Sequence, residues 1–187
     1  MVFKHKDVVR IALIHNGSVY LQELNELLNK IFEKDRVAVL SPWDKIDGYD
    51  AYVFSGRSSR TQTKLKDIFR LIERIVDKPS LYICFGAEAF NMYLGGTLKV
   101  LESFLKGEIT IEFKGSSYFA DGAYNFYVSR HLNIGRLNKY SKPVAFSKFG
   151  VEAFEYRNSF ALMFHPEKSN SQGERLVKSF FEKSLKT

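Results

Sequence analysis

The feature that most constrains the fold is an alternation, in the first half of the chain, of short apolar runs and longer amphipathic stretches. The short runs have the β-branched and aliphatic composition of buried strands and cover residues 8–14, 37–40, 51–54 and 81–84. The stretches with apolar residues at helical spacing cover residues 21–32, 65–75 and 87–94. Parallel strands need crossover connections, which helices usually supply. The pattern therefore predicts an α/β fold with a mainly parallel open sheet and helices on both of its faces.

The second half of the chain has a different pattern. Short β-like segments, separated by Gly, Asn, Asp and Ser, cover residues 108–113, 125–128, 144–147, 151–156 and 160–164. An amphipathic helix is predicted for residues 172–186. We expect these strands to extend one edge of the sheet. No repeat or linker interrupts the sequence, so residues 1–187 are interpreted as one domain.

Composition limits the class of protein. The 187 residues are 45% hydrophobic, which suits one compact domain with an ordinary core. No apolar run reaches the roughly 18 residues that a membrane span needs. The first ten residues are charged and lack the long apolar segment of a secretory signal. We expect a soluble, cytoplasmic protein that does not contact a membrane.

The net charge of +7 could attract nucleic acid, an anionic substrate or an acidic protein. Its densest clusters lie at residues 4–10, 57–66 and 139–148. No zinc-finger spacing or aromatic RNA-binding motif accompanies them, so we interpret the charge as a solvated surface and expect no nucleic-acid binding. A single cysteine, Cys84, excludes an internal disulfide and a multi-cysteine zinc site.

Cys84 lies between a predicted strand and a predicted helix. A nucleophile at such a strand-to-helix turn is exposed, and the helix N-terminus favours an anion there. The turns after two other predicted strands, Asn16-Gly17 and Ser55-Gly56, should lie at the same edge of the sheet. A lone cysteine can equally be a small apolar residue at the end of a buried strand. The turn alone is therefore a weak signal.

A second motif, His165-Pro166-Glu167, directly follows the predicted strand at residues 160–164. A cysteine nucleophile needs a base to take its proton, and the base needs an acceptor that fixes its tautomer. Glu167 can supply that acceptor to His165 across a turn stiffened by Pro166. The two motifs together indicate nucleophilic chemistry at the carboxyl ends of the strands.

With these two motifs the chain resembles the class I (triad) glutamine amidotransferases, which combine a G-x-C-x-G turn with a distal H-P-E. Three further segments resemble the family: the Ser55-Gly56 loop, the Gly95-Gly96 pair after the predicted helix, and Val151-Glu152-Ala153. The resemblance covers nearly the whole chain. It implies the flavodoxin-like architecture of that family, with extra antiparallel strands in the second half.

The resemblance implies hydrolysis of glutamine through a γ-glutamyl thioester, with ammonia passed to a synthetase partner. Cys84 would attack the side-chain amide, His165 would move the proton and Glu167 would orient His165. Backbone N–H groups of Arg57 and Phe85 would hold the oxyanion. Gly56, Glu88 and Ser129 would contact the substrate. The family needs no metal and no organic cofactor.

Three positions depart from the family pattern. Tyr82 stands where the family has a glycine two positions before the cysteine, and Glu88 stands where it has a glutamine. Arg57 replaces the second glycine of the usual Ser-Gly-Gly-Pro loop. Arg57 can keep the direction of its N–H if its φ is negative. Glu88 can either bind the α-amino group of glutamine or slow the attack through its charge.

The implied partner is the second subunit of a GMP synthetase, an anthranilate synthase or an imidazole glycerol phosphate synthase. Two alternatives remain: a stand-alone hydrolase of γ-glutamyl compounds, and a non-catalytic relative that binds or regulates a partner. Outside the motifs, His15 and Asn16 are expected to face a partner or cap the next helix. Trp43 is expected to pack locally.

Overall fold

The computed structural model describes residues 9–32, 36–58 and 64–186. The charged start of the chain, most of the basic cluster at 4–10 and part of the one at 57–66 lie outside these residues. The first residue of the strand predicted for residues 8–14 also lies outside them.

One half of the sheet is parallel and is built from short, apolar strands. In spatial order these strands are β2 (Val37–Leu40), β1 (Ile11–Ile14), β3 (Ala51–Phe54), β4 (Ser80–Ile83) and β9 (Ser159–Leu162). Every residue of β1, β3, β4 and β9 is buried. Such strands are covered on both faces, which is why they appear in the sequence as continuous apolar runs.

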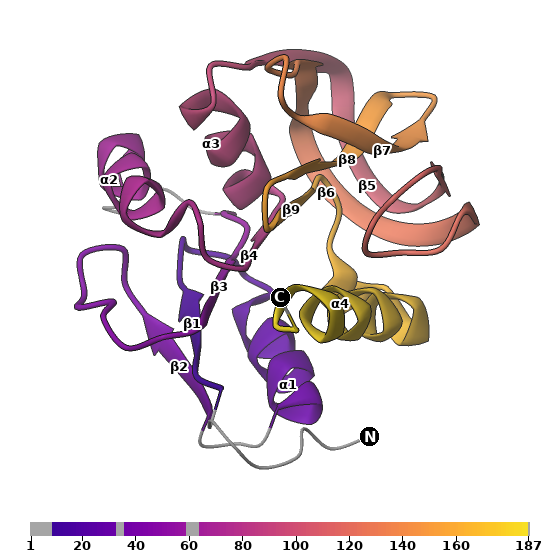
Figure 1. The fold of residues 1–187 in the computed structure, drawn as a ribbon. Coiled ribbons are helices and arrows are strands. Elements are labelled where there is room, and N and C mark those ends of the chain that lie inside the picture. The colour runs from indigo at the N-terminus through magenta and orange to yellow at the C-terminus, as the bar shows by residue number, and fades with distance from the viewer. Residues whose placement is uncertain (1–8, 33–35, 59–63, 187) are drawn as a thin grey trace.

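The other half of the sheet is antiparallel. Beyond β9 the order continues with β8 (Gly150–Tyr156), β7 (Lys142–Ser147), β5 (Thr97–Phe113) and β6 (Gly122–Arg136), which gives nine strands within the described residues. Figure 1 shows β5 and β6 as long curved ribbons. Both strands are much longer than predicted. Their outer parts were not recognised in the sequence, because these parts are largely exposed and carry charged residues instead of the apolar pattern of a buried strand.

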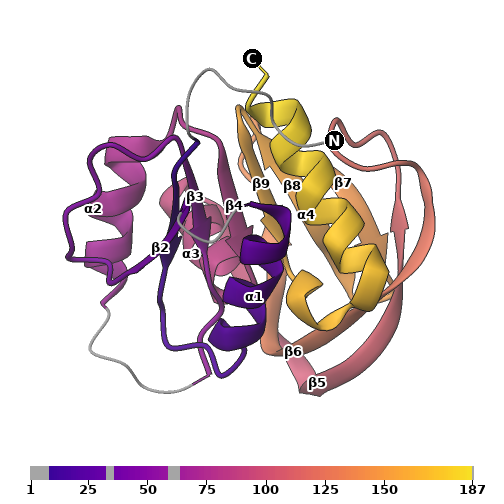
Figure 2. The same cartoon turned by 90° about the horizontal axis from the view of Figure 1, so that it is seen from below.

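Helices cover both faces of the parallel half, as the sequence predicted. Helices α1 (Leu21–Ile31) and α4 (Asn170–Ser184) lie on one face, and α2 (Leu65–Ile75) and α3 (Phe85–Tyr93) lie on the other (Figures 1 and 2). Each pair buries its apolar side in a separate core, one on either side of the sheet. The predicted α/β class is confirmed, with an antiparallel part larger than expected.

The sheet curls so that its last strand returns to the centre of the molecule. By hydrogen-bond order β6 is the edge strand farthest from β2. Nevertheless Tyr127 of β6 accepts a hydrogen bond of 2.7 Å from the N–H of His165, which follows β9. The curl therefore brings residues of β6 to the carboxyl ends of β4 and β9.

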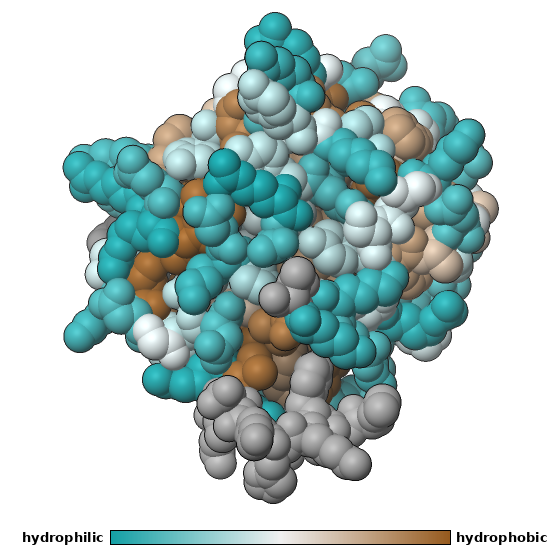
Figure 3. Space-filling model, viewed as in Figure 1, coloured by the Kyte–Doolittle hydropathy of each residue, from teal (hydrophilic) through white to brown (hydrophobic). Residues whose placement is uncertain are grey.

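The surface seen in Figure 3 is mostly hydrophilic, with small separated hydrophobic areas. Among the described residues, no helix combines the length and the apolar character that crossing a bilayer requires.

Gly173, in the first turn of α4, packs directly against the short 3-10 turn η2 (Pro166–Lys168). A Cβ at this position would overlap the backbone carbonyl of Pro166. Alanine in an open helix position would be favourable, but here we expect Gly173→Ala to lower the free energy of unfolding by about 1–3 kcal/mol through overpacking. Urea denaturation measures the change. The exposed Ser171→Ala is the matched control, and an unchanged midpoint for Gly173→Ala would contradict the expectation.

Candidate active site

Cys84 forms a strained turn between β4 and α3. Its φ of +50° and ψ of −109° lie in a region that non-glycine residues rarely occupy. The turn is held by hydrogen bonds from the Cys84 N–H to the Leu162 carbonyl (2.8 Å) and from the Glu88 N–H to the Cys84 carbonyl (2.9 Å). A non-glycine residue held in this way at the start of a helix is typical of a functional site.

Gly86 and Tyr82 explain how the turn packs. A Cβ on Gly86 would lie 2.9 Å from the backbone oxygen of Phe54, so only glycine allows α3 to approach β3 this closely. The ring of Tyr82 is fully buried in the core on the α3 side, stacked between Phe54 (4.6 Å) and Phe90 (4.0 Å). The departure at position 82 is therefore accommodated by aromatic packing, away from the thiol.

His165 lies beyond the end of β9 and points towards Cys84 and Glu167. Its Nδ1 lies 2.8 Å from Oε1 of Glu167, and both side chains are buried. Because a carboxylate only accepts hydrogen bonds, Nδ1–H is the donor and Nε2 is left to accept a proton. Cys84 lies close enough to His165 to influence the pKa of the imidazole, and both residues border Gly56. The structure thus brings the three predicted residues together.

The charge state of His165 follows from these neighbours. Burial by itself lowers the pKa of the imidazole. The charges of Cys84 and Glu167, and its hydrogen bond to Glu167, outweigh burial and raise the pKa of His165 well above its usual value. A raised pKa makes the imidazole a better acceptor for the proton of a neighbouring thiol.

The Ser55-Gly56-Arg57 loop lies against the same residues. A Cβ on Gly56 would lie 3.0 Å from Cε1 of His165 and 3.5 Å from Cβ of Cys84, so glycine is required there for close approach. Arg57 is not among the residues with positive φ, and its guanidinium lies 3.7 Å from the centre of the Phe85 ring. The replacement of the family's second glycine by Arg57 therefore needs no left-handed backbone.

The loop is held by Asn16, whose turn was predicted at this edge of the sheet but whose hydrogen bonds to Ser55 were not. The Asn16 N–H donates to Ser55 Oγ, and Asn16 Nδ2 donates to the Ser55 carbonyl, each at 2.9 Å. Asn16 is fully buried and does not cap α1, which begins after Tyr20. The expectation that His15 and Asn16 face a partner or cap a helix is wrong for Asn16. Its place directly after β1 was the available signal.

A cavity of about 280 Å³ opens beside the thiol. Its lining includes Cys84, Arg57, Glu88, Ser129 and Arg130. The backbone carbonyl of Ser129 lies 3.8 Å from the sulfur of Cys84. The predicted substrate-contact residues Glu88 and Ser129 therefore border the same cavity as the predicted nucleophile.

Glu88 is nine-tenths buried at this cavity. Within the described part of the chain its carboxyl group has no hydrogen-bond or ion-pair partner. Burial raises the pKa of Glu88, although Arg57, Arg130 and His165 oppose the rise through their charges. Keeping this carboxyl group ionised while buried costs free energy, unless a cationic group enters the cavity and pairs with it.

The sequence analysis did not predict that two tyrosines, Tyr20 and Tyr127, lie next to the imidazole of His165. The ring of Tyr20 lies 5.0 Å from the imidazole, edge to face, and its hydroxyl lies 3.3 Å from that of Tyr127. The hydrogen bond to Tyr127 is the main cause of a lowered pKa of Tyr20. Neither residue belongs to a motif, and only the curled path of β6 brings them together.

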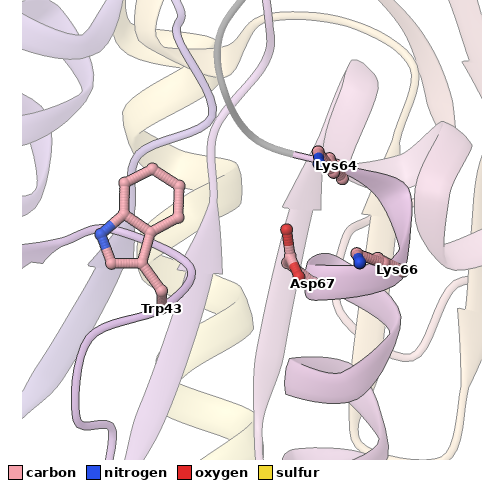
Figure 4. A pocket seen from close by; sticks show the side chains of 4 residues that line it. All are labelled: Trp43, Lys64, Lys66 and Asp67. Carbon is pink, nitrogen blue, oxygen red and sulfur yellow. The ribbon is translucent and has the colours of Figure 1, made fainter.

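A second cavity, of about 470 Å³, is lined by Trp43, Lys64, Lys66 and Asp67 (Figure 4). The expected local packing of Trp43 is wrong, because 60% of its side chain is exposed. Trp43 follows β2, on the wall of this cavity. Among the described residues, no group of side chains suited to hold a metal ion occurs at this cavity or elsewhere.

The fold and this geometry define an α/β protein with a cysteine at a strand-to-helix turn and a histidine–carboxylate pair beside it. No known family profile matches the sequence. Relatives do: the chain is 26% identical to the imidazole glycerol phosphate synthase subunit HisH of Blochmanniella pennsylvanica, over 93% of this chain and 100% of that protein. It is 29% identical to HisH of Picrophilus torridus, over 92% of this chain and 98% of that protein.

Solved structures agree in fold. A Thermoplasma acidophilum protein, described as one of the subunits of a GMP synthase, superposes with a TM-score of 0.88 at 19% identity, over 97% of this chain and 96% of that one. A glutamine amidotransferase from Thermotoga maritima superposes with a TM-score of 0.79 at 16% identity, over 97% and 100%. The HisH relatives confirm the resemblance to the class I glutamine amidotransferases, and the solved structures confirm the fold.

Proposed function

We propose that this chain is a glutaminase subunit that hydrolyses glutamine and supplies ammonia to a synthetase partner. The observation that carries the proposal is the grouping of Cys84 with the hydrogen-bonded pair His165–Glu167, beside Gly56, at the carboxyl ends of β4 and β9. The names of the curated relatives, which are synthase subunits, support the same function.

In the proposed reaction the sulfur of Cys84 attacks the side-chain amide carbon of glutamine. His165 takes the thiol proton and returns it to the departing ammonia, while Glu167 holds the imidazole and stabilises its charged form. Water then cleaves the thioester and releases glutamate. The steps need only the residues of this site.

Two backbone N–H groups would stabilise the oxyanion formed during attack. One belongs to Phe85, at the start of α3, where the helix dipole favours negative charge. The other belongs to Arg57, next to Gly56, which packs on His165 and Cys84. Gly56 thus keeps the loop close enough for the substrate to touch both groups.

The amino-acid end of glutamine would occupy the cavity beside Cys84. The carboxylate of Glu88, which has no ion-pair partner among residues 9–32, 36–58 and 64–186, would pair with the α-ammonium group, and Ser129 would contact the same end of the substrate. This pairing explains why a buried glutamate is tolerated where the family has glutamine. We further propose that residues 1–187 form one domain and that the acceptor site lies on a separate subunit.

The proposal is tested by measuring ammonia and glutamate release from glutamine. The chain is assayed alone and with the second subunit of an imidazole glycerol phosphate synthase or of a GMP synthase. Release that rises with one subunit and not the other identifies the type of partner. Hydrolysis of γ-glutamyl amides by the chain alone, without preference for glutamine, would instead favour a stand-alone hydrolase. No turnover under any of these conditions would reject the proposal.

The role of Glu88 gives a separate prediction. Glu88→Gln restores the family residue but removes the charge, and losing a charged hydrogen-bond partner costs about 1.5–3 kcal/mol. We expect KM for glutamine to rise roughly 10- to 100-fold with little change in kcat. Because the pKa of Glu88 is raised, KM should also begin to rise on acidification at a higher pH than for an ordinary glutamate.

Steady-state kinetics from pH 5 to 8, with glutamine and with N-acetylglutamine, check this prediction. N-acetylglutamine lacks the ammonium group, so the unchanged protein should bind it more weakly than glutamine. In Glu88→Gln the KM values for the two substrates should become similar. Glu73→Gln, on the exposed side of α2, is the control. A lower KM for glutamine in Glu88→Gln would show that the charge hinders binding.

A further inference from the structure

Arg130 of β6 forms a fully buried ion pair with Glu152, the central residue of the Val151-Glu152-Ala153 segment, and the sequence did not predict this pairing. Its Nη2 donates to both carboxylate oxygens of Glu152 in β8, at 2.7 and 2.8 Å, and both side chains are inaccessible to solvent. Its Nη1 donates to the backbone carbonyl of Met163 at 2.5 Å. Ser147 donates a further hydrogen bond of 2.6 Å to Glu152. One side chain therefore joins β6, β8 and the segment after β9.

Stability does not explain this pair. Removing two charges from water is costly, and well-packed apolar residues of similar size often give an equally or more stable protein. Burial raises the pKa of Glu152, and the charge of Arg130 opposes the rise. The position of the pair next to the active-site segments explains it better than stability does.

Both anchoring points adjoin the active site. Met163 lies two residues before His165, and Ser129, next to Arg130, is the residue whose carbonyl contacts the sulfur of Cys84. The Met163 N–H is held by the Glu152 carbonyl at 2.8 Å, and the His165 N–H by the Tyr127 carbonyl at 2.7 Å. The Arg130 guanidinium completes the attachment of this segment to β6 and β8.

We propose that Arg130, with Glu152, is a positioning residue that fixes His165 relative to Cys84. It acts through the Met163 carbonyl and through its own backbone next to Ser129. The inference rests on the proposed function for the roles of Cys84 and His165. A displacement of about 1 Å between reacting groups can lower a rate by 100-fold, so such an attachment matters for the rate more than for binding.

The test compares the buried pair with an exposed one. The apolar double variant Arg130→Met/Glu152→Leu removes both buried charges and leaves neither partner unpaired. The control is Arg157→Met/Asp77→Asn, an exposed pair that joins the β8–β9 turn to the turn after α2. Melting temperature, kcat and KM for glutamine, and the rate of Cys84 alkylation by iodoacetamide are measured for each.

We expect the buried double variant to melt at or above the temperature of the unchanged protein. Its kcat should fall by about 10- to 100-fold, with KM within about threefold, and alkylation at pH 7 should slow. The control should keep all of these values. Arg130→Lys retains the positive charge but cannot make the several parallel hydrogen bonds of the planar guanidinium group. The variant should therefore fold and show an intermediate loss of kcat.

A stable double variant with unchanged kcat and alkylation would overturn the inference. A rise in KM with unchanged kcat would also overturn it, because Arg130 would then bind substrate. If the double variant does not fold, Arg130→Lys decides by the same criteria. If the unchanged protein does not turn over glutamine in any assay, the proposed function fails, and the alkylation rates still test the positioning of His165.

Discussion

Cys84→Ala should remove glutamine hydrolysis almost completely. The sulfur of Cys84 is the atom that would bond to the substrate, and no other thiol exists in the chain. Loss of a nucleophile of this kind lowers kcat by at least about 1,000-fold, leaving what the oxyanion donors and binding supply alone. Ammonia release in a coupled assay, with the partner subunit present, measures the loss.

The change should leave the fold intact, since alanine fills most of the small buried space of the thiol. Equal melting temperatures for the two proteins check this. A γ-glutamyl-directed thiol reagent should label the unchanged protein at Cys84, as mass spectrometry can show, and should leave Cys84→Ala unlabelled. Full turnover by Cys84→Ala would refute both the thioester route and the assignment of the nucleophile.

Glu167→Gln should have the second largest effect. The amide oxygen can still accept the hydrogen bond from His165 Nδ1, so the geometry can persist while the negative charge is lost. Because Glu167 helps to raise the pKa of His165, that pKa should fall in the variant. Replacing the acid of a catalytic triad by its amide lowers kcat by roughly 100- to 10,000-fold.

The measurements are kcat for glutamine and the titration of the His165 ring followed by NMR. Glu108→Gln, an exposed change of the same kind on β5, is the control for altered net charge. A variant with unchanged kcat and an unchanged His165 titration would remove Glu167 from the mechanism. Reduced kcat with an unchanged titration would assign it a purely steric role.

The parallel half of the fold could be predicted because its strands are buried on both faces. Continuous apolar runs such as Ala51–Phe54 are unambiguous, and the helices between them have clear periodicity. The long β5–β6 hairpin could not be predicted in full. Its outer residues are partly exposed, Val100 by 78%, and the register shifts between Val100 and Leu105. An irregular, half-exposed ladder leaves no regular alternation in the sequence.

The candidate site divides in the same way. Cys84, His165 and Glu167 were found because each belongs to a motif of adjacent residues. Arg130 was missed, because its contacts to Glu152 and Met163 join residues far apart in the chain. The Asn16-Gly17 turn was placed at the correct edge of the sheet, but the hydrogen bonds of Asn16 to Ser55 were not predicted, for the same reason. Such contacts depend on strand order and on the curl of the sheet, which local patterns do not encode.

The backbone of Cys84 has a consequence for how this chain can change over time. A left-handed φ at a non-glycine residue costs about 1–3 kcal/mol, and substitution by glycine would relieve it. If selection acted on folding alone, replacement of Cys84 by glycine would be favoured early. A chain freed from glutamine chemistry would therefore be expected to lose this residue before its core, and its presence beside His165 and Glu167 favours the enzyme over a non-catalytic descendant.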